Sequence, residues 1–203
     1  LTISLKKVTS LRYGENPHQN GALYSESNAP VGMAGARQLH GRELSYNNLM
    51  DADAAWRTAS DFTDATVSVV KHANSCGLAS RDDIAEAYLA AYEGDTVSAF
   101  GGIVAFNRKV TAAAADAMDP VFYEVVIAPD YEPQALEILQ KKRNLRILAI
   151  DKQPDTSAYD LRPITGGVLV QASDSIEENP ASWTVATKRA PSEAEMKDLA
   201  FAW

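Results

Sequence analysis

The chain has 203 residues, of which 46% are hydrophobic and 23% charged, and its formal net charge is −8. This composition is typical of one large or two small globular domains, and the charge argues against non-specific binding to nucleic acid. No apolar run is long enough to span a bilayer, and no signal-peptide pattern is present. The single cysteine, Cys76, excludes an internal disulfide framework and a cysteine-based zinc site. We therefore expect a cytoplasmic protein without a membrane or nucleic-acid partner.

The first part of the chain differs in pattern from the rest. Its first 45 residues are rich in Gly, Asn, Pro and Ser and show little periodicity. We assign residues 1–50 to a loop-rich N-terminal segment and residues 51–203 to an α/β domain. The chain begins at Leu1 and stops at Trp203 inside a helical pattern, so we expect a piece of a longer polypeptide.

From residue 51 onwards, helical and extended patterns alternate. Strands are predicted at 65–70, 102–106, 123–128, 146–150 and 167–171. Helices are predicted at 51–60, between Ser80 and Gly94, at 111–118, at 133–142 and from Ser192 onwards, whereas 151–165 and 173–182 read as irregular. Such alternation predicts a mostly parallel sheet with helices on both faces.

Two titratable residues, Lys71 and His72, directly follow the strand predicted at 65–70. We predict that the chain turns from Ala73 to Gly77, which places both side chains at the carboxyl edge of a sheet, where α/β proteins bind ligands. Histidine titrates near neutral pH and suits general base catalysis, and a lysine beside it can stabilise developing negative charge. The alternative is a solvated lysine and a histidine bound to backbone.

Two loops before residue 50 are candidate binding segments. In the first, Arg12 and Tyr13 precede a glycine and are suited to gripping a phosphate, although a structural loop explains the same residues. In the second, Asn48 can hydrogen-bond a ligand, and the simpler interpretation is that Asn48 or Asp51 caps a helix.

A third candidate loop contains Phe100, Gly101 and Gly102. Paired glycines let a ligand approach the backbone, and Phe100 can face a flat ring, whereas a tight turn with a core phenylalanine is the alternative. Glu124 is a lone carboxylate at the start of an apolar strand, either half exposed or an acceptor for a ligand hydroxyl. The sequence contains no P-loop, no dinucleotide fingerprint, no nucleophile elbow and no His-Glu-x-x-His motif.

Five segments occur together in one order and carry a family resemblance. They are 12–19 (RYGENPHQ), 44–48 (LSYNN), 51–56 (DADAAW), 71–74 (KHAN) and 98–105 (SAFGGIVA). Each is weak alone, but the ordered set closely resembles the transformylase region of the bifunctional AICAR transformylase/IMP cyclohydrolase (PurH) family. The resemblance runs from about residue 11 to residue 150 and continues more loosely to the end.

The resemblance implies a fold and a place in a larger enzyme. The fold would be a three-layer α/β/α subdomain with a mixed sheet, similar to cytidine deaminase, and the first of two that form the transformylase. The cyclohydrolase domain and the second subdomain would then be absent, and the isolated chain would be inactive. The sequence lacks the His-x-Glu and Pro-Cys-x-x-Cys motifs of zinc deaminases, so no metal is expected.

The resemblance also implies a reaction in IMP biosynthesis. A formyl group would pass from the co-substrate 10-formyltetrahydrofolate to the 5-amino group of AICAR ribonucleotide, giving FAICAR, with no tightly bound cofactor and with a homodimeric full-length enzyme. His72 would be the general base, and Lys71 would stabilise the oxyanion.

The other site assignments also follow from the resemblance. Arg12 and Tyr13 would bind near the phosphate, Asn48 would hydrogen-bond the nucleotide, and Gly101 would lie against its base or carboxamide. In addition, Glu124 would contact the ribose and Phe100 the folate.

One position departs from the family pattern. Ser75 stands where the bacterial turn usually has proline, so either the turn that presents His72 is looser or serine adopts the same shape at an entropic cost. Two alternatives stay open at this point. Instead of carrying the reaction, the chain could be a non-catalytic nucleotide-binding or dimerisation module of the same enzyme. It could also be an unrelated α/β ligand-binding domain.

Overall fold

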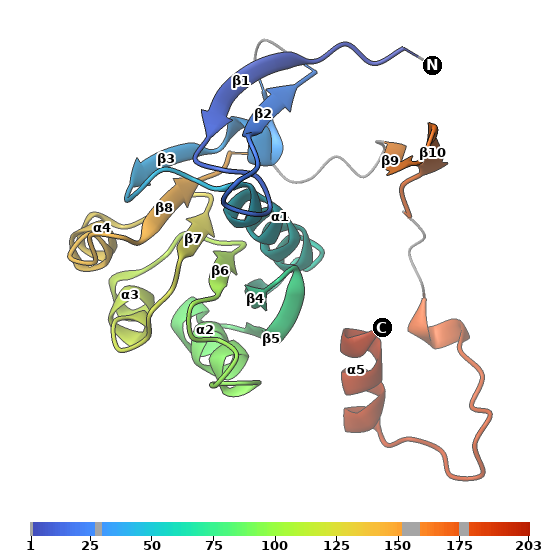
Figure 1. Ribbon diagram of the computed structural model, residues 1–203. Coiled ribbons are helices and arrows are strands. Elements are labelled where there is room, and N and C mark those ends of the chain that lie inside the picture. Colours follow the sequence, from blue (N-terminus) through green and yellow to red (C-terminus); the bar gives the residue numbers. More distant parts are fainter. Residues whose placement is uncertain (1, 27–29, 152–158, 175–178) are drawn as a thin grey trace. The chain divides into compact units, whose positions relative to one another are not determined.

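A computed structural model describes residues 2–26, 30–151, 159–174 and 179–203 (Figure 1). The chain divides into two compact units, Leu1–Pro154 and Asp155–Trp203. No helix in the described ranges is long and apolar enough to cross a membrane.

The first unit is built on a six-stranded sheet in the order β3-β8-β7-β6-β4-β5. Its strands are β3 (Arg37–His40), β4 (Ala65–Lys71), β5 (Asn74–Arg81), β6 (Ile103–Phe106), β7 (Val125–Ala128) and β8 (Arg146–Ala149). Only the β6/β7 and β7/β8 pairs are parallel, and the other three pairs are antiparallel. The mixed sheet is confirmed, whereas the expectation of a mostly parallel sheet is wrong because β4 runs against both of its neighbours.

Helices cover both faces of this sheet, which confirms the three-layer α/β/α arrangement (Figure 1). One face packs against α1 (Tyr46–Ser60), and the other packs against α2 (Ile84–Glu93), α3 (Ala112–Met118) and α4 (Pro133–Leu139). Alternate strand residues divide between the two cores: Val104 and Phe106 face α2 and α3, while Ile103 and Ala105 face α1. Because alternate side chains point to two faces that are both buried, these strands appear in the sequence as uninterrupted apolar runs.

The N-terminal segment contains more regular structure than its composition suggests. Strands β1 (Lys6–Leu11) and β2 (Gly21–Ser25) form an antiparallel pair, η1 (Gly32–Gly35) is a short 3₁₀ helix, and β3 joins the main sheet beside β8. The expectation of a loop-rich segment is therefore wrong for these residues. Both faces of β1 are exposed, so its residues do not alternate between polar and apolar.

Two predicted helix starts also need correction. Helix α1 begins at Tyr46 rather than at residue 51, because Ser45 and Asn48 form a reciprocal capping box. Helix α2 is capped by Asp83 rather than Ser80, because residues 74–81 form β5. The start of α3 after Thr111 agrees with the prediction, and α4 ends at Leu139, short of the predicted residue 142.

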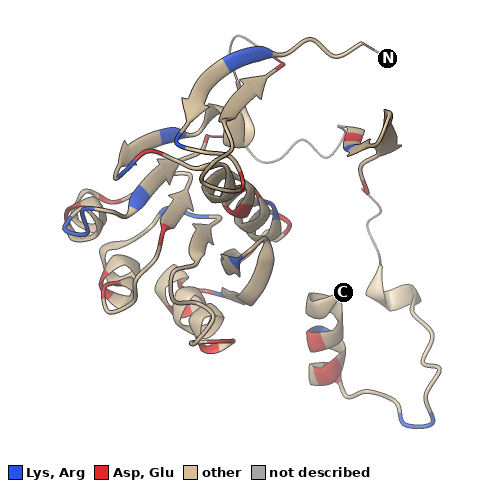
Figure 2. Ribbon diagram, viewed as in Figure 1, with Lys and Arg blue, Asp and Glu red and all other residues tan. Residues whose placement is uncertain are grey.

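The second unit contains the antiparallel pair β9 (Tyr159–Ile164) and β10 (Gly167–Ala172), the 3₁₀ helix η2 (Pro180–Ser182) and α5 (Glu193–Ala202). The predicted irregular segment at 151–165 is thus wrong for β9, and its residues 152–158 lie outside the described ranges. The capping box predicted at Ser192 and Glu195 is present, and acidic side chains lie in the first turn of α5 (Figure 2).

Candidate functional site

The candidate site lies along one edge of the sheet in the first unit. Strand β4 ends at this edge with Lys71, and β6 begins there, because Val70 pairs with Ile103 in an antiparallel register. Since β7 and β8 are parallel to β6, they also begin at this edge. The carboxyl ends of β4 and β3 therefore lie at this edge, because β3 is antiparallel to β8, whereas β5, β6, β7 and β8 contribute their amino ends.

The turn after β4 is shorter than predicted. Lys71 pairs with Asn74, so the hairpin loop consists of His72 and Ala73 alone, with φ values of 54° and 58°. The prediction of a turn from Ala73 to Gly77 is wrong, because residues 74–77 belong to β5. Ser75 therefore lies on a strand, beside the β-bulge that follows it, and not in the turn that carries His72.

Side chains bind both polar ends of the peptide between His72 and Ala73. The Ala73 N–H donates to Asp51 Oδ1 at 2.9 Å, and Asn74 Nδ2 donates to the His72 carbonyl at 2.8 Å. The His72 side chain is exposed, and within the described ranges its ring makes no hydrogen bond. The backbone bends at His72, so neighbouring residues here need not point to opposite faces as they do within a strand.

Lys71 contacts the loop that leads into β6. Its Nζ donates to the Phe100 carbonyl at 3.0 Å. In this loop Gly101 has a φ of 75° and donates its N–H to the Phe122 carbonyl at 2.8 Å. A Cβ on Gly102 would lie 2.8 Å from the Val70 carbonyl oxygen, so a larger residue would push β4 and this loop apart. Phe100 is 60% exposed, and its ring lies 5.5 Å from that of Phe122, so it is not a core residue.

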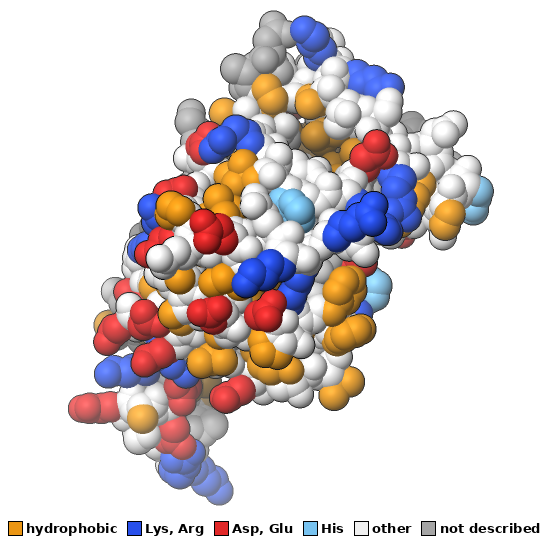
Figure 3. All heavy atoms as spheres, turned by 90° about the vertical axis from the view of Figure 1, so that its left-hand side faces the viewer, with side chains coloured by type: hydrophobic (Ala, Val, Ile, Leu, Met, Phe, Trp, Pro, Cys, Tyr) orange, Lys and Arg blue, Asp and Glu red, His pale blue; other side chains and the backbone are white. Residues whose placement is uncertain are grey.

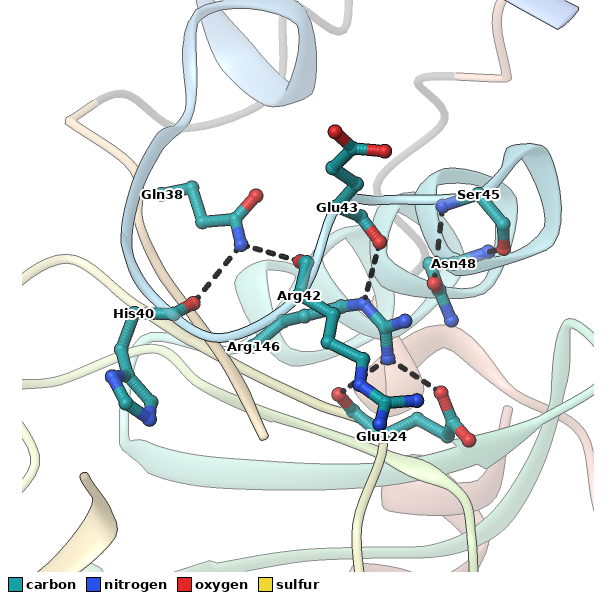
Figure 4. Close-up of polar contacts among 8 residues, drawn as sticks. All are labelled: Gln38, His40, Arg42, Glu43, Ser45, Asn48, Glu124 and Arg146. Atoms are coloured by element: carbon teal, nitrogen blue, oxygen red, sulfur yellow. Dashed lines mark hydrogen bonds and ion pairs between the residues drawn. The ribbon is translucent and has the colours of Figure 1, made fainter. Parts of the chain in front are cut away.

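Glu124 and Arg146 form an ion pair at the beginnings of β7 and β8 (Figure 4). Arg146 Nη1 lies 2.6 Å from Glu124 Oε2, and Arg146 Nε donates to the Glu43 carbonyl at 3.0 Å. The Arg146 side chain is only 5% exposed, whereas that of Glu124 is 40% exposed. The carboxylate thus stays accessible while a buried guanidinium fixes its position.

The Arg12 loop lies against the beginning of α1. The Arg12 N–H donates to the Leu44 carbonyl, and the Tyr46 N–H donates to the Tyr13 carbonyl, each at 3.3 Å. The Arg12 guanidinium carbon lies 4.8 Å from the centre of the Tyr13 ring, a cation–π geometry. Asn48 Oδ1 accepts from the Ser45 N–H, so its amide nitrogen is the group left to serve a ligand.

Hydrogen bonds connect the predicted site residues from one end of this edge to the other. Lys71 binds the Phe100 loop, Glu124 donates its N–H to the Gly102 carbonyl, and Arg146 joins Glu124 to Glu43. Leu44, the next residue, accepts from Arg12. Asp51, in the remaining segment, accepts from Ala73, so the structure brings residues of all five segments to one edge although they are far apart in sequence.

The sequence model described as "AICARFT/IMPCHase bienzyme" matches residues 1–203.

The chain belongs to the AICARFT/IMPCHase bienzyme family.

AICARFT/IMPCHase proteins have AICAR transformylase and IMP cyclohydrolase activities in purine biosynthesis, and 10-formyltetrahydrofolate is the co-substrate of the transformylase. Membership excludes the alternative of an unrelated α/β ligand-binding domain. In the described ranges, no three His, Cys, Asp or Glu side chains are grouped as a metal site requires. Lysine and arginine side chains are interspersed with acidic ones on the face shown in Figure 3.

Two residues at the edge of the sheet that carries the candidate site, Arg146 and Asp51, were not predicted from the sequence. The signal for Arg146 was a cation at the first position of an otherwise apolar strand. For Asp51 the sequence suggested helix capping, but it lies inside α1 and accepts the Ala73 N–H. Only the fold brings α1 next to the hairpin loop.

A further carboxyl group on α1, that of Asp53, provides a test of local electrostatics. Asp53 lines an apolar pocket of about 410 Å³ together with Leu11 and Tyr46. Burial raises the pKa of Asp53, and the charge of Arg57 opposes this only partly. Ionised Asp53 therefore destabilises the fold, and its contribution worsens as the pH rises through the raised pKa.

We expect Asp53→Asn to raise the melting temperature at pH 7 by about 1–3 °C, because solvent screening keeps the electrostatic effect small. The difference should disappear as the pH falls well below the ordinary pKa of an aspartate, where Asp53 is protonated in both the folded and the unfolded chain. Thermal unfolding followed by circular dichroism at several pH values measures it. A variant less stable than the parent chain at pH 7 would contradict this assignment.

Proposed function

We propose that this chain carries the formyl-transfer site of the bienzyme, where 10-formyltetrahydrofolate and AICAR ribonucleotide react to give FAICAR. The observation that carries the proposal is the exposed His72 on a turn fixed from both sides, directly after Lys71. Family membership supplies the reaction, and the hydrogen-bonded edge supports placing it here.

His72 acts as the general base in this proposal. The 5-amino group of AICAR is a poor nucleophile, because its lone pair is delocalised into the imidazole ring and the carboxamide. It loses a proton as it attacks the formyl carbon, and an imidazole can accept that proton near neutral pH. An exposed ring on a fixed backbone can meet the amine without first breaking a hydrogen bond to the protein.

Lys71 stabilises the oxyanion that forms at the formyl carbon. Its ammonium group has three N–H donors, and the bond to the Phe100 carbonyl uses one of them. That bond holds Nζ beside the hairpin loop, and two donors remain for the negative oxygen. A donor already in place is effective because it does not reorganise during the reaction. When the oxyanion collapses, the bond between the formyl carbon and the folate nitrogen breaks, and tetrahydrofolate leaves with the proton that His72 accepted from the amine.

The remaining assignments are contacts with the two substrates. Arg12 and Tyr13 bind the phosphate, Asn48 donates through its amide nitrogen, and Gly101 lets the base or carboxamide approach the backbone. Glu124, with one face open to solvent and Arg146 behind it, accepts from ribose hydroxyls. Phe100 presents an exposed ring to the folate.

One observation favours a second candidate, a nucleotide-binding or dimerisation module that does not catalyse transfer alone. Phe100 and Phe122 are 60% and 41% exposed, so neither ring is enclosed within the chain. A folate site completed by a further segment or by a second subunit of a cytoplasmic homodimer has this appearance. Formyl transfer measured with this chain alone separates the candidates: turnover supports the first, and nucleotide binding without turnover supports the second.

Both candidate functions require AICAR ribonucleotide to bind at this edge of the sheet, and a binding measurement tests that requirement. We expect AICAR ribonucleotide at 100 times its Kd to raise the melting temperature by about 5–10 °C. Arg12→Met should weaken binding by about 10- to 100-fold, because it removes a charge-assisted contact with the phosphate. The matched control is Arg81→Met, at the far end of β5 from the hairpin loop. Equal affinities of the two variants would contradict the placement of the phosphate.

A further inference from the structure

The central peptide of the β4–β5 hairpin loop is bound at both ends by side chains. Its N–H belongs to Ala73 and donates to Asp51 on α1, and its carbonyl belongs to His72 and accepts from Asn74. We propose that Asp51 is a positioning residue for formyl transfer, holding this peptide so that the His72 ring keeps one direction. This inference rests on the proposed role of His72 as the base.

The conformation of the loop explains why it needs such support. A two-residue hairpin loop with positive φ at both positions strongly favours Asn-Gly or Asp-Gly. Here the two positions are His72 and Ala73, with φ values of 54° and 58°. A non-glycine residue in this region is strained and persists where the surrounding structure holds it. Strain of this kind is concentrated at functional sites, and this loop carries the proposed base.

The hydrogen bonds act on the part of the loop that the sheet leaves unbound. Lys71 and Asn74 form the last pair between the strands, so the peptide between His72 and Ala73 lies beyond the ladder. Rotation of this peptide changes ψ of His72 and φ of Ala73. Because Lys71 and Asn74 are held by the ladder, φ of His72 has to change with them, and this torsion turns the Cα–Cβ bond that carries the imidazole. Asp51 resists that rotation from outside the hairpin, and Asn74 resists it from within.

The position of Asp51 also connects the base to the nucleotide contacts. Asp51 follows Asn48 by three residues on α1, so the two lie side by side on that helix. Ala52 and Ala55 are fully buried between α1 and the sheet, so the helix itself is fixed. A rigid helix that holds the hairpin loop at Asp51 and contacts the ligand at Asn48 sets the distance between base and substrate.

The test compares Asp51→Ala with Asp51→Asn in the bienzyme. We expect Asp51→Ala to lower kcat by about 10- to 100-fold, the size of effect that misplacing a catalytic group by about 1 Å produces, with little change in the KM for AICAR ribonucleotide. Asp51→Asn should keep nearly the parental kcat, because its amide oxygen still accepts the Ala73 N–H. Asn74→Ala, which releases the other end of the same peptide, should lower kcat selectively as well. Asp53→Asn on the same helix is the matched control.

Hydrogen exchange of the Ala73 amide gives a readout that does not depend on activity. It should be faster in Asp51→Ala than in Asp51→Asn. Parental kcat in Asp51→Ala, alongside a large loss in His72→Ala, would overturn this inference and leave the proposed function intact. An Asp51→Asn variant as slow as Asp51→Ala, or equal changes in kcat and KM with a lower melting temperature, would also overturn it. Parental rates in His72→Ala would instead overturn the proposed function itself.

Discussion

In the bienzyme, His72→Ala is expected to lower the turnover number of formyl transfer by about 100- to 10,000-fold. The amino group of AICAR then has no positioned acceptor for its proton, and water has to serve instead. The KM for AICAR ribonucleotide should change little, since the proposed contacts with phosphate and ribose lie elsewhere on the edge. Steady-state formation of FAICAR at saturating 10-formyltetrahydrofolate measures the effect.

The loop conformation dictates the choice of variants. His72 has a positive φ, a region that asparagine tolerates better than alanine does. His72→Asn therefore removes the base while preserving the turn, and both variants should be equally slow. His40→Ala is the matched control, because His40 lies on β3 and its ring contacts the Lys142 carbonyl at 3.3 Å. Near-parental turnover in His72→Asn would show that another group accepts the proton.

Glu124→Ala is expected to lower the free energy of unfolding by about 1.5–3 kcal/mol, the range for hydrogen bonds to charged groups. The loss arises because Arg146 is 5% exposed and keeps its charge after its partner is removed. Chemical denaturation of the chain measures the change. The same variant should weaken nucleotide binding if Glu124 contacts the ribose.

An exposed ion pair provides the control for this second experiment. Lys109 and Asp130 lie 3.0 Å apart with side chains 51% and 66% exposed, so Asp130→Ala should cost only about 0–1 kcal/mol. In a double-mutant cycle, adding Arg146→Met to Glu124→Ala should cost less than the sum of the single changes. Strict additivity would mean that the pair contributes no coupling.

The elements that sequence predicted well are those with a strong local signal. The apolar runs of β6, β7 and β8 are buried on both faces, so hydrophobicity alone locates them. Thr111 and the Ser192–Glu195 pair cap their helices as predicted, since capping depends only on neighbouring residues.

The missed elements depend on contacts that are distant in sequence. Strand β5 contains small and polar residues, and its loop lacks the Asn-Gly signal, so nothing local indicated a hairpin. The direction of β4 relative to β6 is likewise not encoded in the pattern of either strand.

Prediction of the site followed the same division. The family motifs pointed to His72 and Arg12, which lie on loops, and to Lys71, the last residue of β4. The residues that hold such loops in place, Asp51 and Arg146, act through tertiary contacts with Ala73 and Glu124. Because these partners are distant in sequence, the sequence pattern alone does not identify Asp51 and Arg146 as supports of the site.

The pairing of β3 with β8 has a consequence for synthesis on the ribosome. Strand β3 emerges early, yet the strand that binds its edge ends at Ala149, near the close of the first unit. Until β8 has been synthesised, a growing polypeptide exposes an unpaired β3, and the Glu43 carbonyl has no hydrogen bond from Arg146. Translation that halts before β8 should thus yield a product prone to aggregation or dependent on chaperones, even though the motif-bearing segments have already been made.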